Sequence, residues 1–241
     1  MLPIPVLQLP HWRVNYRPSV FNEGLIASIG ACQELVRSTK LSLRGWDFPH
    51  YDTRNGKSEV GKNWIGSSIE FGNHMEYWKL FQSGQFLHLQ AVRESLDADW
   101  KTKLEGAARS HAHWRADVDW ETVPGYFSLV NFIYTVTEVF EFAARIAQRG
   151  VYTGEVAISI GLHGVRGFVL TPELDRAWMD YRALSENTLE QTWTVESRAL
   201  IAGSRDAAAS ALVWFFERFD WQSPNTDMIR RDQEKFLAGR W

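Results

Sequence analysis

The chain has 241 residues, 45% hydrophobic and 23% charged, a composition typical of a globular protein with a substantial core. Its single cysteine, Cys32, excludes an intrachain disulfide framework and favours a reducing compartment, so we expect a cytoplasmic protein. The net charge of −3, with Arg230-Arg231 as the densest basic cluster, gives no sign of a nucleic-acid-binding surface. We expect neither a signal peptide nor a membrane span.

The N-terminal part predicts a strand followed by a helix. Apolar and polar residues alternate over 11–17, which predicts a half-buried strand. Asn22 is typical of a helix N-cap, and apolar residues at helical spacing predict an amphipathic helix over 22–39. Cys32 lies on the apolar stripe of this helix, which favours an inert thiol in the core.

A short strand over 41–44 and a loop over 45–52 are expected next. The polar, glycine-containing stretch 53–72 predicts a long loop. The stretch 75–92 predicts a β-hairpin, because Ser83-Gly84 separates two apolar runs and suits a tight turn.

The second half of the chain predicts a strand with strict alternation over 110–120 and a largely buried helix after Pro124-Gly125. The further expected elements are a hairpin of 156–160 with 167–170, a helix opening at 171–173, a strand over 188–195, and helices over 197–219 and 226–238. This order lacks the regular alternation of an α/β fold. It predicts one α+β domain over 1–241, with a mostly antiparallel sheet, a long central helix and C-terminal helices.

The loop after the 41–44 strand is the first candidate site. It carries Arg44, Trp46, Asp47, His50 and Asp52 within nine residues, a mixture that suits recognition of a planar ligand or a peptide. His50 and Asp52 also have the chemistry of a general base and its orienting partner. The structural alternative is a packed turn in which Trp46 and Phe48 are buried and Arg44 pairs with Asp47. The chain has 12 tryptophans, most of them expected in the core, and Trp46 is the one we expect to contact a ligand.

The polar side of the 110–120 segment is the second candidate. His111 and His113 point the same way on a strand, and with Asp117 they offer ligands for a divalent metal. This spacing loosely resembles the cupin metal motif, although the second cupin motif has no counterpart here. The alternative is the solvated face of an amphipathic strand.

Other chemistry has little support in the residues. The glycines at 161, 164 and 167 follow a predicted strand but precede another strand, so they predict a turn and not a phosphate loop. No nucleophile elbow, Walker motif, Cys-x-x-Cys or His-Glu-x-x-His occurs.

Several stretches together are similar to an uncharacterised region of bacterial proteins that carry a Schlafen-AlbA-type DNA-binding domain. They are His11-Trp12-Arg13-Val14, residues 43–50, Glu76-Tyr77-Trp78, residues 82–86, residues 216–221 and Gln233. The DNA-binding domain itself is not visible in this chain. The resemblance implies a companion or sensor part and no catalytic residues.

Two hypotheses follow. The first is a ligand-binding or protein-interaction module of a bacterial regulatory or defence-associated system, with a protein partner or a small ligand and with oligomers possible. The second is a metal-dependent enzyme that uses His111, His113 and an aspartate.

Overall fold

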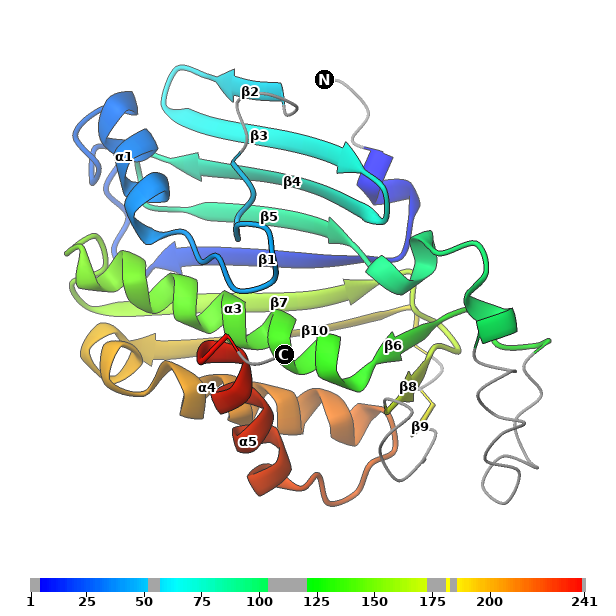
Figure 1. The fold of residues 1–241 in the computed structure, drawn as a ribbon. Helices are drawn as coiled ribbons and strands as arrows, with labels where there is room; N and C mark the ends of the chain where they lie inside the picture. Colours follow the sequence, from blue (N-terminus) through cyan, green and yellow to red (C-terminus); the bar gives the residue numbers. More distant parts are fainter. Residues whose placement is uncertain (1–4, 52–56, 104–120, 173–180, 183–185, 240–241) are drawn as a thin grey trace.

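The computed structural model describes residues 5–51, 57–103, 121–172, 181–182 and 186–239. They form an α+β fold in which the helices cover one face of a seven-stranded antiparallel sheet (Figure 1). The predicted fold class, with its long central helix and C-terminal helices, is confirmed.

The large sheet has the strand order β10-β7-β1-β5-β4-β3-β2. Its strands are β1 (His11–Pro18), β2 (Lys57–Val60), β3 (Trp64–Phe71), β4 (His74–Phe81), β5 (Phe86–Ala91), β7 (Glu155–His163) and β10 (Thr188–Glu196). A small second sheet contains β6 (Tyr126–Ser128), β8 (Val169–Thr171) and β9 (Tyr181–Arg182). The helices are η1 (Pro5–Gln8), α1 (Ile29–Thr39), η2 (Arg93–Leu96), α3 (Leu129–Gln148), α4 (Ser197–Arg218) and α5 (Thr226–Leu237).

Strand register decides which side chains face the helices. Val14 of β1 lies opposite His88 of β5, and His88 lies opposite Trp78 of β4, so these three side chains share one face. This face is buried, and it includes fully buried Tyr16 and Phe86 one step further along the strands. The sheet therefore presents a mixed apolar and polar surface to α3.

The central helix α3 is buried on most of its sides and packs on the sheet, side by side with α4. The Tyr16 hydroxyl donates a hydrogen bond of 2.6 Å to the carbonyl of Val139, which fixes α3 against β1. Phe132 of α3 makes edge-on ring contacts with Trp12 on one side and with Phe215 of α4 on the other. Of the tryptophans in the described residues, Trp12, Trp78 and Trp100 are buried, and Trp46, Trp64, Trp193, Trp214 and Trp221 are partly buried.

The first helix begins later than expected. Ser28 is its N-cap, since its hydroxyl accepts from the backbone N–H of Ala31. The Asn22 side chain instead accepts from the N–H of Gly24 and stabilises a local turn. The prediction that Asn22 caps this helix was therefore wrong. The helix spans Ile29–Thr39 and is shorter than the expected 22–39.

Two expectations around residues 41–72 were wrong. The 41–44 segment contributes only a single β-bridge, between Leu41 and Phe48. Strands β2 and β3 occupy much of 53–72, where a loop was expected. The buried face of β3 includes the polar residue Ser67, which is 1% exposed. The alternation of apolar and polar residues that marks a strand is therefore absent from the sequence of β3.

The prediction of a hairpin between 156–160 and 167–170 was also wrong. β7 pairs on one side with β1 and on the other with β10, so neither edge is free for β8. β8 joins the small sheet, in parallel with β6. Gly164 and Gly167 lie in the turn after β7, both at positive φ, as expected, whereas Gly161 is part of β7 itself. The expected strand 110–120 and the helix opening at 171–173 lie outside the described residues, apart from Thr171 and Pro172 themselves.

Among the described helices, α4 alone has the length and composition of a membrane-spanning helix, with a mean hydropathy of 1.2 in a window that is 39% buried. Core helices of folded domains meet the same criterion. Leu212 and Phe215 of α4 are fully buried, and the helix packs on α3, α5 and β10. We therefore describe α4 as a helix of the core.

A glycine substitution tests the close approach of β3 to β4. A Cβ on Gly66 would lie 2.6 Å from the carbonyl oxygen of Trp78, so Gly66→Ala should lower the free energy of unfolding by about 1–3 kcal/mol. A Cβ on Gly154 would meet nothing nearer than 3.8 Å, so Gly154→Ala should change it by less than about 0.5 kcal/mol. Urea denaturation of both variants measures the difference, and equal losses would contradict this packing.

Candidate functional site

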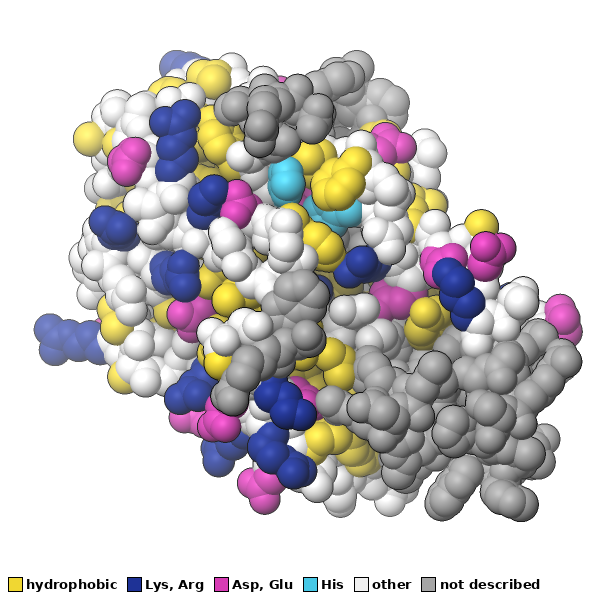
Figure 2. Space-filling view, in the orientation of Figure 1, with side chains coloured by type: hydrophobic (Ala, Val, Ile, Leu, Met, Phe, Trp, Pro, Cys, Tyr) yellow, Lys and Arg dark blue, Asp and Glu magenta, His cyan; other side chains and the backbone are white. Residues whose placement is uncertain are grey.

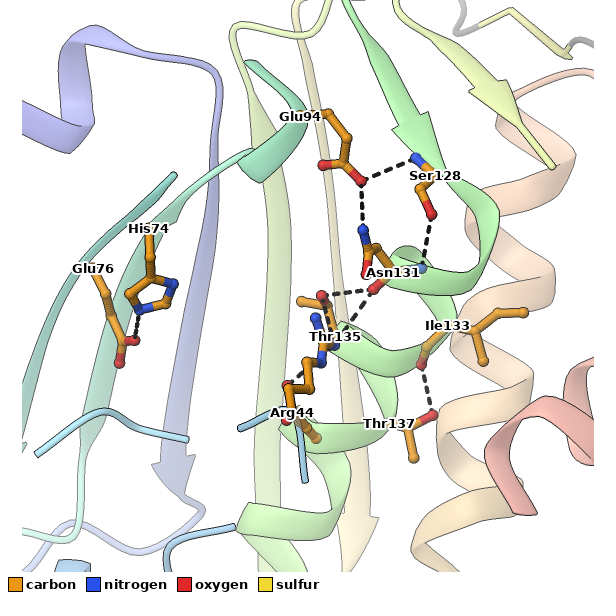
Figure 3. Close-up of polar contacts among 10 residues, drawn as sticks. Arg44, His74, Glu76, Glu94, Ser128, Asn131, Ile133, Thr135 and Thr137 are labelled. Atoms are coloured by element: carbon orange, nitrogen blue, oxygen red, sulfur yellow. Dashed lines mark hydrogen bonds and ion pairs between the residues drawn. The ribbon is translucent and has the colours of Figure 1, made fainter. Parts of the chain in front are cut away.

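Buried and partly buried charged and polar side chains gather between the 44–51 loop, β4, β5 and α3. We call this group the polar cluster; its members are Arg44, His50, His74, Glu76, His88, Glu94, Asn131, Thr135 and Glu138. Figure 3 shows Arg44, Asn131 and Thr135 along the side of α3, with His74 and Glu76 further away on β4. On the surface of this face, histidine side chains lie among hydrophobic ones (Figure 2).

Glu76 of β4 is the centre of the sheet side of the polar cluster. His74 Nε2 lies 2.8 Å from one of its carboxylate oxygens, and His88 Nε2 lies 3.0 Å from the other. All three side chains are at most 3% exposed. Burial by itself would raise the pKa of Glu76, but the two imidazoles outweigh burial and lower it well below its usual range. Glu76 is therefore an ionised carboxylate held by two imidazoles.

The same carboxylate holds the 44–51 loop. The backbone N–H of His50 donates to Glu76 at 2.9 Å, and the indole N–H of Trp78 donates to the carbonyl of His50 at 2.7 Å. Phe48 packs on the His88 ring, with centroids 4.8 Å apart. The loop is thus attached to β4 and β5 through its main chain and one aromatic side chain.

Arg44 fixes the other end of this loop to α3. Its guanidinium lies 3.1 Å from the Glu138 carboxylate and donates to the Thr135 hydroxyl at 3.1 Å. The Tyr134 and Phe236 rings, which stack on each other, lie beside it, with centroids 5.5 and 5.4 Å from the guanidinium carbon. Burial lowers the pKa of Arg44, and Glu138 opposes that effect.

Glu138 has the pKa most suited to a change of charge near neutral pH. Its side chain is 4% exposed, and this burial raises its pKa to about 7. Arg44 works in the opposite direction, while the negative charge of Glu76 adds to the rise. A buried carboxyl with such a pKa, beside an arginine, is an arrangement found at functional sites.

Glu94 belongs to the start of α3. Its carboxylate accepts from the backbone N–H of Ser128 and from the Asn131 amide, each at 3.1 Å. The Ser128 hydroxyl in turn caps the helix at the N–H of Asn131. Burial raises the pKa of Glu94, and these hydrogen bonds oppose the rise. Glu94 therefore has a structural role as a cap of the helix N-terminus.

A small pocket opens beside Arg44, with a volume of about 10 Å³, room for about one water molecule. It is lined by Trp12, Arg44, Gln90, Ala91, Arg93, Glu94, Phe127, Asn131, Phe132 and Thr135. At the rim, the Arg93 guanidinium lies over the Trp46 ring, 4.8 Å from its centroid, and Trp46 in turn contacts His74.

Several buried polar atoms of the polar cluster have no hydrogen-bond partner among the described residues. They include Arg44 Nε, Glu138 Oε1, both ring nitrogens of His50, His74 Nδ1 and His88 Nδ1. Native proteins satisfy nearly all such atoms, so a concentration of them in one place calls for an explanation. It marks this part of the molecule as the candidate site.

The structure brings together three of the loop residues singled out from the sequence: Arg44, Trp46 and His50 all lie at the polar cluster. Asp47 does not, because it pairs with Lys40. Of the packed-turn alternative, the pairing of Arg44 with Asp47 was therefore wrong, whereas Phe48 is buried as that alternative expected and Trp46 is partly buried. Asp52 lies outside the described residues.

Sequence reasoning missed the polar cluster's members on the sheet and on α3, chiefly His74, Glu76, His88 and Glu138. A usable signal was present, because Glu76 has the same strand parity as buried Trp78, which places a carboxylate on an apolar face. Arg93 and Glu94 come just after β5, in η2, and no sequence pattern marks them as site residues.

The proposed metal ligands His111, His113 and Asp117 lie outside the described residues, so that site stays a prediction. Within the part of the chain that the structure describes, no three His, Cys, Asp or Glu side chains are placed to hold a metal ion.

Replacing Glu138 tests its ionisation. Because its pKa rises from 4.5 to about 7 on folding, the folded state binds more protons between these values, and stability falls as pH rises through them. Glu138→Gln removes this loss of stability. Between about pH 4.5 and pH 7, the free energy of unfolding of the variant should therefore rise by about 3 kcal/mol relative to that of the wild type. Denaturation at a series of pH values measures this difference, and parallel pH profiles would contradict the assignment.

Cys32 offers a simpler test. It is fully buried, and burial raises the pKa of its thiol to about 11. A thiol-reactive dye should therefore label it only after unfolding in denaturant. Rapid labelling of the native protein would contradict its position in the core.

Comparison with protein-family models, curated proteins and solved structures finds no match to this chain. The resemblance to the bacterial Schlafen-AlbA-associated region stays a prediction.

Proposed function

We propose that this chain is a binding module for a small ligand with an anionic group, such as a carboxylate or phosphate. The group would enter the pocket between Arg44 and Arg93. The proposal develops the first of the two hypotheses from the sequence, and the observation that carries it is the pair of arginines that line one pocket.

The two arginines retain donors for a ligand. Arg93 has no ion-pair partner among the described residues, and Arg44 Nε has no hydrogen-bond partner there. Trp46 holds the Arg93 guanidinium by stacking, which limits the ordering cost of binding. Planar guanidinium groups recognise carboxylates and phosphates through paired hydrogen bonds. These features together favour an anion.

The walls of the pocket support the same reading. Trp12, Phe127 and Phe132 supply the apolar part of the lining, which strengthens the attraction between opposite charges, while Gln90, Glu94, Asn131 and Thr135 supply its polar part beside the two arginines. A volume of about 10 Å³, about that of one water molecule, admits a single oxygen atom of an anionic group and not the body of a ligand. We therefore propose that one oxygen of a terminal anionic group is buried and that the remainder lies at the rim near Trp46.

The cellular setting is also part of the proposal. The single cysteine supports a cytoplasmic protein, and the sequence resemblance supports a sensor role in a bacterial regulatory or defence-associated system. In such a role, occupation of the pocket would change how the 44–51 loop meets a partner.

Removing Arg93 tests the proposal. Benzoate and inorganic phosphate, each at millimolar concentration, should raise the Tm of the wild-type protein, since a ligand that binds only the folded state stabilises it. Arg93→Ala should lose most of this rise, because the variant lacks a guanidinium that has no ion-pair partner among the described residues. Differential scanning fluorimetry measures both.

The chain offers a matched control. Arg218 also stacks on a tryptophan, with its guanidinium carbon 4.1 Å from the Trp214 centroid, but it lies on α4 away from the pocket. Arg218→Ala should keep the full rise in Tm. An equal loss in both variants, or no rise in the wild type, would sink the proposal.

A further inference from the structure

We infer that the anionic group binds at Arg44 together with a proton on Glu138, so that ligand binding and protonation are coupled. This inference rests on the proposed function and adds to it a residue that sets the pH range of binding.

Arg44 already has an anionic partner. One guanidinium nitrogen, Nη2, is shared by the Glu138 carboxylate at 3.1 Å, the Thr135 hydroxyl at 3.1 Å and the Asn131 carbonyl at 3.5 Å. A ligand anion at the unpartnered Nε would place a second negative charge beside Glu138, with both arginine and glutamate shielded from solvent. Like charges this close in a buried site repel strongly.

Protonation of Glu138 removes that repulsion. A neutral carboxyl still accepts a hydrogen bond from Arg44, but it leaves the guanidinium charge for the ligand. The carboxyl oxygen Oε1 has no partner among the described residues, so it is the atom open to the proton. The exchange is balanced in charge, since one ligand anion takes the place of one carboxylate.

The groups around Glu138 allow it to change charge near neutral pH. It is faced by Arg44 from the loop, by Glu76 and His74 from β4, and by Tyr16 from β1. Burial raises the pKa of Glu138 to about 7 despite the nearby guanidinium. Glu76 does not compete for the proton, because its two imidazoles hold its pKa far lower.

The direction of the effect follows from this. Below about pH 7 Glu138 already carries its proton, and affinity should be nearly independent of pH. Above that value each ligand must bring a proton from solution, and affinity should fall about tenfold per pH unit.

Isothermal titration calorimetry with benzoate tests the coupling, because benzoate keeps one charge between about pH 6 and pH 8.5. Titrations at about pH 8 in two buffers of different ionisation enthalpy should report uptake of about one proton per ligand, and at about pH 6 almost none. Glu138→Gln should bind with a pH-independent affinity close to that of the wild type at low pH. Glu141→Gln, a control on the same helix, should keep the wild-type profile.

The outcomes separate the two proposals. No binding of benzoate at any pH contradicts the proposed function. Binding with no proton uptake by the wild type at about pH 8, or with the same pH profile in Glu138→Gln, contradicts only the coupling. The proton count needs no variant, so it decides the matter even if Glu138→Gln does not fold.

Discussion

The contact on which this face of the molecule depends is the buried carboxylate of Glu76 between the His74 and His88 imidazoles. Burying a charge is costly unless partners compensate it, and here two rings and a backbone N–H do so. That compensation lets an antiparallel sheet keep an ionised group on its core side. It also gives the 44–51 loop an anchor, and through Arg44 the loop reaches Glu138 on α3. Sheet, loop and helix are joined through charged groups as well as apolar packing.

Local signals predicted much of the fold. Four predictions are confirmed, because the apolar residues of each element repeat with its period. They are the strand at 11–17, the hairpin after residue 74, α3 and the C-terminal helices. Errors arose where a polar residue served two purposes. Asn22 stabilises a turn and does not cap a helix. Ser67 is polar but buried, so the strand that contains it was predicted as a loop. The placement of β7 depended on partners distant in sequence, so no local pattern could reveal it.

Only part of the candidate site could be predicted from the sequence, for a related reason. Aromatic and charged residues crowded in one loop pointed to Arg44, Trp46 and His50. Their partners come from β4, β5 and α3, and only strand register and helix packing bring them together. Glu138 illustrates the limit, since its pKa is raised by burial against elements far away in the chain. A sequence shows a carboxylate in an apolar helix, but not the arginine that meets it.

The way the loop is attached has a consequence for substitutions within it. His50 is held through its main-chain N–H and carbonyl, so the bonds to Glu76 and Trp78 do not require any particular side chain at that position. Trp46 likewise sits at the rim, outside the anchoring contacts. Substitutions at both positions should therefore leave the course of the loop unchanged. The loop can therefore present different side chains at these two positions while its attachment to β4 stays almost unchanged.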